Sequence, residues 1–247
     1  SKLYDYILSD EIIIPKKFEK FYTEKVLRLS YFFPPNFRAN EKLPLNQVTR
    51  EQFELPKNAF VFTCFNHNRK ITEKEFDIWM RLLNEIEDSV LWLQKSNDFS
   101  DINLKKEAQK RNVNPKRIIF AKKLKSIKMH LARYYLGDLG LDTFFYNGHT
   151  TTSDALCMGL PVLTKIGKSF SARVSASILN SIGLNDLISK NEKEYEEKAL
   201  YYARNRIELK KIKDLLYSQR QDSSLSNPKE YTLDLEKTYS ELVSKIE

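Results

Sequence analysis

The chain has 247 residues, of which 41% are hydrophobic, and its 41 Lys and Arg against 33 Asp and Glu give a net charge of +8. This composition supports a folded core and excludes global disorder. The sequence contains no apolar run of membrane-spanning length, no secretory signal, and only two cysteines, Cys64 and Cys157, which form neither a disulfide framework nor a metal motif. We expect a cytoplasmic protein with no membrane partner. Because it begins at Ser1 rather than Met, we expect a portion of a longer protein.

Residues 1–57 differ from the rest of the chain, being rich in aromatic side chains and interrupted by prolines. The pattern predicts a strand over residues 4–8 and a helix over 18–29, where Phe21, Lys25 and Arg28 have helical spacing. The segment is too short to bury a core of its own. We therefore expect it to be the end of a preceding domain or a packed extension.

A strand–helix alternation begins at residue 59 and predicts a second unit over residues 58–247. The expected strands are 59–65, 89–93, 117–120, 139–145 and 161–164, and the expected helices are 76–86, 101–111, 126–135, 151–158, 171–181, 192–206, 207–221 and 229–246. Thr72 and Glu75 form a capping box before the first of these helices. The pattern predicts an α/β fold, a doubly wound parallel sheet of Rossmann type followed by C-terminal helices.

In such sheets, ligands bind beyond the carboxyl ends of the strands, so the polar residues after each strand are the candidates for a site. The fourth strand is followed by Asn147, Gly148, His149, Thr150 and Thr151. A helix N-terminus presents unpaired N–H groups to an anion, and Gly148 permits its close approach. Asp154, one turn on, could accept hydrogen bonds from ribose. A helix capped by Thr151 and Asp154 explains the spacing equally well.

Three further groups follow other strands. The first strand is directly followed by Asn66, His67, Asn68, Arg69 and Lys70. The lysine could reach a phosphate, although an ordinary polar loop has the same composition. His130 and Arg133 share a helix face after the third strand, as charged surface residues also do. Residues 167–173 follow the fifth strand, where a serine could be an N-cap and an arginine could pair with an acid.

A basic band runs from Leu104 to Arg133, with eleven Lys and Arg against the single acid Glu107. Such a band suits phosphates or nucleic acid, or it is a solvated face of two helices. The sequence has no cluster with metal-ligand spacing, no Walker loop and no dinucleotide-binding glycine motif.

Several of these motifs together resemble the O-linked N-acetylglucosamine transferase and SPINDLY family, glycosyltransferase family 41. The matching segments, in order over residues 59–242, include Leu141-Asp142-Thr143, Asn147 to Thr151, Asp154, Gly159 to Val162, Phe65-Asn66 with Lys70, residues 89–93 and 117–120, and Ser171 to Val174. The resemblance implies the nucleotide-sugar-binding half of a GT-B glycosyltransferase. It also implies that the first catalytic domain and tetratricopeptide repeats belong to the complete protein.

Matched position by position, the resemblance implies that Lys70 contacts the diphosphate and stabilises the departing nucleotide. It implies that Asp154 binds ribose, that His130 lies against the base and that Arg133 matches a family arginine. The loop around the phosphates would comprise Asn147, Gly148, His149, Thr150 and Thr151. His67 stands where animal members have glutamine. One extra residue before His130 leaves the family's loop lysine unassigned among Lys122, Lys123, Lys125 and Lys128.

The resulting hypothesis is an inverting transferase that uses UDP-GlcNAc as donor, needs neither metal nor cofactor, and modifies Ser or Thr of a protein acceptor. The family also includes members that use GDP-fucose or a UDP-hexose, so these donors remain alternatives. A nucleic-acid-binding module that uses the basic band is the rival from another class, and a non-catalytic partner subunit is a third interpretation.

Overall fold

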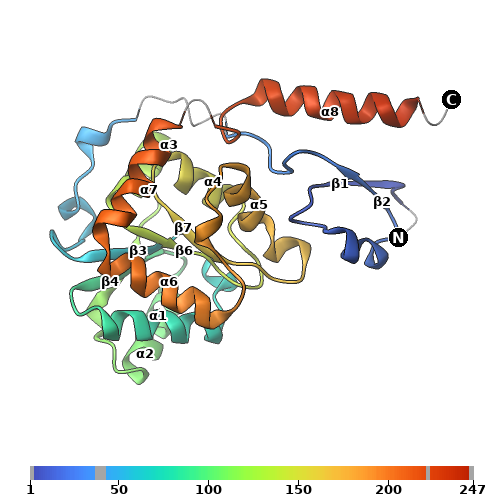
Figure 1. The fold of residues 1–247 in the computed structure, drawn as a ribbon. Helices are drawn as coiled ribbons and strands as arrows, with labels where there is room; N and C mark the ends of the chain where they lie inside the picture. The colour runs from blue at the N-terminus through green and yellow to red at the C-terminus, as the bar shows by residue number, and fades with distance from the viewer. Residues whose placement is uncertain (1–2, 37–42, 221–222, 245–247) are drawn as a thin grey trace.

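A six-stranded parallel sheet in the order β5-β4-β3-β6-β7-β8 forms the centre of the computed structural model, which describes residues 3–36, 43–220 and 223–244 (Figure 1). Its strands are β3 (Phe60–Cys64), β4 (Ser89–Gln94), β5 (Ile118–Ala121), β6 (Leu139–Leu141), β7 (Val162–Lys165) and β8 (Ile188–Ser189). The chain winds outward from β3 to β5, then returns and winds outward the other way from β6 to β8. This is the expected doubly wound sheet, and the strand order reverses between β3 and β6.

Helices cover both faces of this sheet (Figure 1). They are α1 (Glu73–Glu85), α2 (Asp98–Lys110), α3 (Ile127–Ala132), α4 (Thr150–Cys157), α5 (Val174–Ser181), α6 (Glu192–Arg204), α7 (Arg206–Ser218) and α8 (Pro228–Val243). The capping box of Thr72 and Glu75 is present at the start of α1, as predicted. The predicted helix ends at Gln221 and Ile246 lie outside the described residues.

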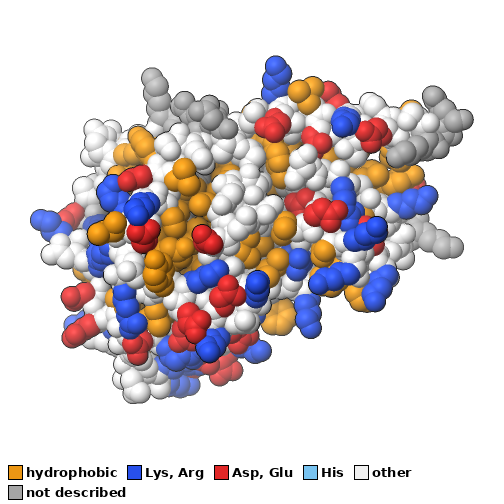
Figure 2. Space-filling model, viewed as in Figure 1, with side chains coloured by type: hydrophobic (Ala, Val, Ile, Leu, Met, Phe, Trp, Pro, Cys, Tyr) orange, Lys and Arg blue, Asp and Glu red, His pale blue; other side chains and the backbone are white. Residues whose placement is uncertain are grey.

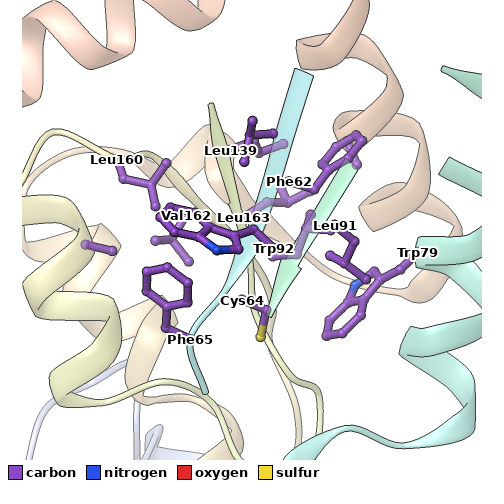
Figure 3. Packing of buried hydrophobic residues seen from close by; sticks show 14 of the residues in the cluster. Phe62, Cys64, Phe65, Trp79, Leu91, Trp92, Leu139, Leu160, Val162 and Leu163 are labelled. Atoms are coloured by element: carbon purple, nitrogen blue, oxygen red, sulfur yellow. The ribbon is translucent and has the colours of Figure 1, made fainter. Parts of the chain in front are cut away.

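The core lies on both sides of β3 and β4, which explains why these strands are continuously apolar. All five residues of β3 are buried, and Trp92 of β4 is fully buried. Figure 3 shows the Trp92 indole lying across the strands near Phe65, with Trp79 of α1 packed on the opposite side. Strands buried on both faces carry no polar alternation, as expected of a parallel sheet covered by helices.

The N-terminal segment forms a separate two-stranded parallel sheet of β1 (Tyr6–Ser9) and β2 (Lys25–Arg28). The predicted helix over residues 18–29 is therefore wrong. A 3-10 helix (Lys16–Phe21) covers the first part of this range, and β2 covers residues 25–28. Pairing with β1 supplies the backbone hydrogen bonds of residues 25–28, so tertiary context overrides the helical spacing.

This N-terminal segment packs against α5, α8 and the main core. Ile13 and Ile14 are buried in the main core cluster, and Arg173 donates a hydrogen bond to the Ile12 carbonyl (2.6 Å). On its other side it meets α8, where the rings of Tyr31 and Tyr231 lie 5.8 Å apart (Figure 1). No helix among the described residues is long and apolar enough to cross a membrane.

Candidate functional site

Two loops meet at the reversal point of the sheet, one following β3 and the other following β6. Asn66 joins them, because its Nδ2 donates to Asp142 Oδ1 (2.9 Å) and to Thr143 Oγ1 (3.0 Å). Its Oδ1 accepts a hydrogen bond from Thr151 Oγ1 (2.6 Å) at the start of α4. One buried amide thus fixes both loops and the helix N-terminus relative to each other.

Asp142 is the buried anchor of the second loop. Its Oδ1 accepts hydrogen bonds from the N–H groups of Thr143 (2.9 Å) and Gly148 (2.7 Å), and its Oδ2 accepts one from Thr164 Oγ1 (2.7 Å). Burial raises the pKa of this carboxyl, and the hydrogen bonds oppose the rise. These bonds draw the chain out of the sheet, which is why β6 ends at Leu141 although the sequence predicted a strand over 139–145.

Gly148 allows the chain to turn tightly into α4. A Cβ atom at this position would collide with the Thr152 hydroxyl oxygen and would lie 2.8 Å from that of Thr151. Its carbonyl accepts a hydrogen bond from Ser175 Oγ (2.7 Å), so the turn is held from α5 as well. The glycine is therefore required by space, not by an unusual backbone angle.

The N-terminus of α4 is not closed by its own side chains. The helix begins at Thr150, and its N-cap, His149, makes no side-chain capping hydrogen bond. Thr151 and Asp154 do not form the capping box that the sequence offered as an alternative. Thr151 donates to Asn66, and Asp154 accepts a hydrogen bond from Asn36. The first turn therefore keeps N–H groups that can bind an anion.

Lys70 reaches across from the first loop to this helix N-terminus. It ends a short 3-10 turn (Asn68–Lys70), and its Nζ donates to the Asn147 carbonyl (2.9 Å). Burial lowers the pKa of Lys70, and the charge of Asp142 opposes that effect. A partly dehydrated ammonium therefore lies beside the uncapped N-terminus of α4.

Tyr146 packs against both Lys70 and His149. The Lys70 Nζ lies 4.2 Å from the centre of the Tyr146 ring, a cation–π distance. The His149 imidazole also stacks on Tyr146, with the two ring centres 4.8 Å apart. Burial lowers the pKa of His149, which favours the neutral ring. Tyr146 thus orients the two basic groups of the site.

Asp154 lies in α4 as expected, but it is buried. Its Oδ1 accepts a hydrogen bond from Asn36 Nδ2 (2.7 Å), a residue of the N-terminal segment. Only 4% of Asp154 is exposed. A ribose would therefore reach this carboxylate only by sharing it with Asn36 or displacing it.

His130 and Arg133 lie after β5 in different environments. His130 is partly buried, with its ring 6.3 Å from that of Phe65, the residue that follows β3. Arg133 is fully buried, and it donates to the Lys122 carbonyl (2.7 Å) and to Gln94 Oε1 (3.2 Å). Burial lowers its pKa to about 10. Arg133 therefore supports the loop before α3 and presents no atom to solvent.

The remaining candidates lie at the margin of the site. His67 is exposed, and its Nδ1 accepts a hydrogen bond from the Arg69 N–H (3.2 Å), which caps the turn that carries Lys70. Thr150 is exposed at the first position of α4. Arg173 was expected to pair with an acid, but it forms no ion pair with the described residues and donates to the carbonyls of Ile12 and Gly167. The side chains of the four loop lysines, at 122, 123, 125 and 128, are exposed.

The basic band is not a continuous basic surface. Arg111 binds the carboxylates of Asp77 and Glu107, and Arg117 donates to the carbonyls of Leu83, Ile86 and Ser89. With Arg133 buried as well, each of the three arginines of the band is held by partners within the protein. In Figure 2, acidic side chains lie among the basic ones around α1 and α2. This arrangement fits the solvated-face interpretation better than a nucleic-acid surface.

Sequence reasoning missed Asn36 and Tyr146, and it placed Asn66 and Asp142 in the matching segments without giving either a role in the site. Asn66 and Asp142 had a usable signal, since each follows the end of a buried strand. Asn36 had none, because its partner lies 118 positions away. Within the described residues, no group of three or more His, Cys, Asp or Glu is placed to hold a metal ion.

The model of glycosyl transferase family 41 matches residues 35–235 of this chain. A Caenorhabditis elegans UDP-N-acetylglucosamine–peptide N-acetylglucosaminyltransferase is 31% identical over 81% of the chain and 17% of its own length. The Arabidopsis thaliana protein named probable UDP-N-acetylglucosamine–peptide N-acetylglucosaminyltransferase SEC is 30% identical over 95% of the chain. The chain spans about a quarter of that relative, 24%.

Solved structures agree with these sequence matches. An O-GlcNAc transferase mutant from Thermobaculum terrenum superposes with a TM-score of 0.84 at 28% identity, covering 95% of this chain and 44% of the other. The lipopolysaccharide glycosyltransferase WaaG shares the fold alone, with a TM-score of 0.65 at 15% identity over 94% of this chain and 61% of the other. The structural and sequence matches agree, and the chain belongs to glycosyltransferase family 41.

Proposed function

We propose that this chain is the donor-binding part of a protein glycosyltransferase that transfers N-acetylglucosamine from UDP-GlcNAc to Ser or Thr, with inversion and without a metal. The observation that carries the proposal is the meeting of the Lys70 ammonium with the uncapped N-terminus of α4 at the reversal point of the sheet. A diphosphate placed there meets a lysine, backbone N–H groups and threonine hydroxyls. The names of the relatives support the choice of donor and acceptor.

The chemistry follows from charge development. As the bond between the sugar and the β-phosphate breaks, its electron pair remains on the departing nucleotide, and negative charge grows on the phosphate oxygens. Lys70 and the first N–H groups of α4 are already oriented toward that position, so little reorganisation is needed when the charge forms. Removing one such donor typically costs about 10²–10³ in kcat.

The same geometry serves other donors with a diphosphate. GDP-fucose and a UDP-hexose would place their phosphates alike, and they differ at the base and the sugar. His130 is the residue that we propose to lie against the base, because its ring stands at the carboxyl edge of the sheet beside Phe65. Asp154 is the proposed ribose contact and Arg133 a support of the loop before α3.

We further propose that the active protein includes a first catalytic domain and tetratricopeptide repeats, and that it is located in the cytoplasm. Residues 1–57 and α8 would belong to the interface with that domain, since Ser30 and Tyr31 contact α8 beside the main sheet. The chain covers 24% of one relative and 44% of one solved structure, which leaves room for these parts. Acceptor binding would lie largely on the remaining domain.

Calorimetric titration with UDP, UDP-GlcNAc, GDP-fucose and an RNA oligomer tests the proposal. We expect saturable binding of UDP and UDP-GlcNAc, weakened at least tenfold by Lys70→Ala, because a charge-assisted hydrogen bond contributes about 1.5–3 kcal/mol. Lys74→Ala is the matched control, since this exposed lysine of α1 lies outside the site. Absence of nucleotide binding by the folded chain would refute the proposal. Tight, salt-sensitive RNA binding unaffected by Lys70→Ala would favour the nucleic-acid module.

A further inference from the structure

A cavity of about 410 Å³ opens at the edge of the sheet opposite to the donor loops. Phe60, the first residue of β3, and Asp138, which precedes β6, line it together with one face of α7. The donor loops follow the last residues of the same two strands. The cavity is therefore separate from the proposed donor site, and its volume falls within the range of about 300–1,000 Å³ that is typical of small-molecule sites.

The charges around the cavity are not balanced. Its two acids already have partners, because Asp138 pairs with Arg50 (2.9 Å) and Asp214 pairs with Lys210 (2.6 Å). Two cations remain, Arg206 and Lys213, and neither has a carboxylate within 4.0 Å among the residues described. An anion entering the cavity would meet uncompensated positive charge.

Lys213 is the more deeply placed of these cations. Its Nζ donates to the Gly137 carbonyl (2.8 Å), which fixes the ammonium just before β6. Burial lowers the pKa of Lys213, and the charge of Asp138 opposes this effect. Lys213 is partly buried and has no carboxylate within 4.0 Å among the described residues, so a bound anion would be favoured at this position.

Aromatic rings provide the other walls. Phe60 lies beneath the Arg206 guanidinium at 5.4 Å, and Tyr135 lies 5.9 Å from the Lys213 ammonium. Tyr135 is 48% exposed and Tyr217 is 60% exposed, which is high for aromatic residues that line a cavity. In Figure 2, hydrophobic side chains gather on the face over α7, with both basic and acidic side chains at the border. A flat apolar group would cover the exposed rings of Tyr135 and Tyr217.

We infer that this cavity is a second ligand site, which binds a small organic anion with a flat apolar body. Arg206 and Lys213 attract its negative group, and Tyr135 and Tyr217 contact its body. The inference goes beyond the proposed transferase function and does not depend on it, because none of these residues belongs to the donor loops.

Titration of the 247-residue chain with 1-naphthoate tests this site, with the neutral 1-naphthalenemethanol as the comparison. We expect saturable naphthoate binding, at least tenfold tighter than that of the alcohol. Lys213→Met should weaken it about tenfold or more, since it removes a charge-assisted contact and keeps the side-chain length. Lys211→Met is the matched control, because this lysine lies on the same helix, pairs with Glu208 (2.7 Å) and is not among the lining residues. The naphthoate affinity of Lys211→Met should stay within about twofold of wild type.

Arg206→Met and Tyr217→Ala replace exposed side chains of the cavity, so they keep the test valid if Lys213→Met unfolds the chain. Both should weaken naphthoate binding, whereas Lys70→Ala should leave it unchanged. The inference is overturned if naphthoate shows no saturable binding, if the alcohol binds equally well, or if Lys211→Met weakens binding as much as the cavity variants. Competition between naphthoate and UDP would also overturn it, because it would place the probe in the donor site.

Discussion

At the scale of single residues, the site depends on how Lys70 is held. The Asn147 carbonyl and the Tyr146 ring fix its ammonium before any ligand arrives. Burial lowers its pKa, so part of its hydration has already been lost. A preorganised cation of this kind interacts more strongly with a phosphate than a flexible, hydrated surface lysine would.

Donor binding should weaken at alkaline pH because of this lysine. As pH rises through the pKa of Lys70 the ammonium is lost, and a pKa below the ordinary 10.5 brings that loss to lower pH. Asp142→Asn removes the charge that raises this pKa, so the alkaline decline should move lower still. UDP affinity measured between about pH 7 and 10 checks this. Lys70→Arg is the control, because arginine stays charged and should flatten the decline. An identical decline in wild type and Asp142→Asn would contradict the assignment.

Tyr146 should matter through its ring and not its hydroxyl. Tyr146→Leu removes a cation–π contact of about 0.5–2 kcal/mol, so UDP binding should weaken roughly 2- to 30-fold. Tyr146→Phe keeps the ring and should stay close to wild type. Calorimetry on the two variants separates the possibilities. Equal losses in both variants would show that the hydroxyl is the important group.

At the scale of elements, the N-terminus of α4 is built by its surroundings. Gly148 gives the space for the turn, Asp142 holds the Gly148 N–H, and Asn66 holds Thr151. None of the first-turn side chains caps the helix. The helix dipole and free N–H groups are thus directed at the position where a phosphate would lie.

Gly148→Ala should disrupt this turn. The added methyl group has no space beside Thr151 and Thr152, so we expect a loss of about 1–3 kcal/mol in the free energy of unfolding. UDP affinity should fall more than tenfold because the N–H groups are displaced. Denaturant unfolding and calorimetry measure the two effects.

Gly159→Asn, just beyond the other end of α4, is the control for this variant. Gly159 has a left-handed φ of +76° that asparagine tolerates, and no atom lies within 4 Å of an added Cβ. Its UDP affinity should match wild type. If Gly148→Ala also binds UDP normally, the turn is not part of the donor site.

The sequence predicted the sheet elements well because buried parallel strands are marked by continuous apolar runs that alternate with segments of helical spacing. β3, β4, β5 and β7 lie where they were expected. The failure at residues 18–29 has a physical cause, since a short strand is defined by its partner and not by local propensity. Likewise, the pattern gave Arg133 a surface helix position, whereas the fold buried it beneath the loop of Lys122.

At the scale of the whole molecule, the segment before the sheet and the last helix form one packed unit. Tyr31 contacts Tyr231, and the Ser30 N–H donates to Asp234 (2.7 Å). The same segment reaches the site through Asn36, which binds Asp154. Asp154, the proposed ribose contact, is therefore held by a residue that sequence reasoning assigned to a different unit.

Asn36→Ala should reveal this dependence. It removes a buried hydrogen bond to a carboxylate, which contributes about 1.5–3 kcal/mol, so the Tm should fall by several degrees. Asn58→Ala, at an exposed position, is the control and should leave the Tm unchanged. Thermal unfolding of the two variants is sufficient. A Tm for Asn36→Ala equal to that of the control would show that this link contributes nothing to stability.

Hydrogen exchange at the level of short peptides, with and without UDP, tests the central claim most directly. The claim is that the loops after β3 and β6 hold the diphosphate of the donor. The expected result is slower exchange in residues 66–70 and 147–152 on UDP binding, with little change elsewhere in the sheet, and no such protection in Lys70→Ala. Protection confined to the basic band or to the cavity at the opposite edge of the sheet would contradict it.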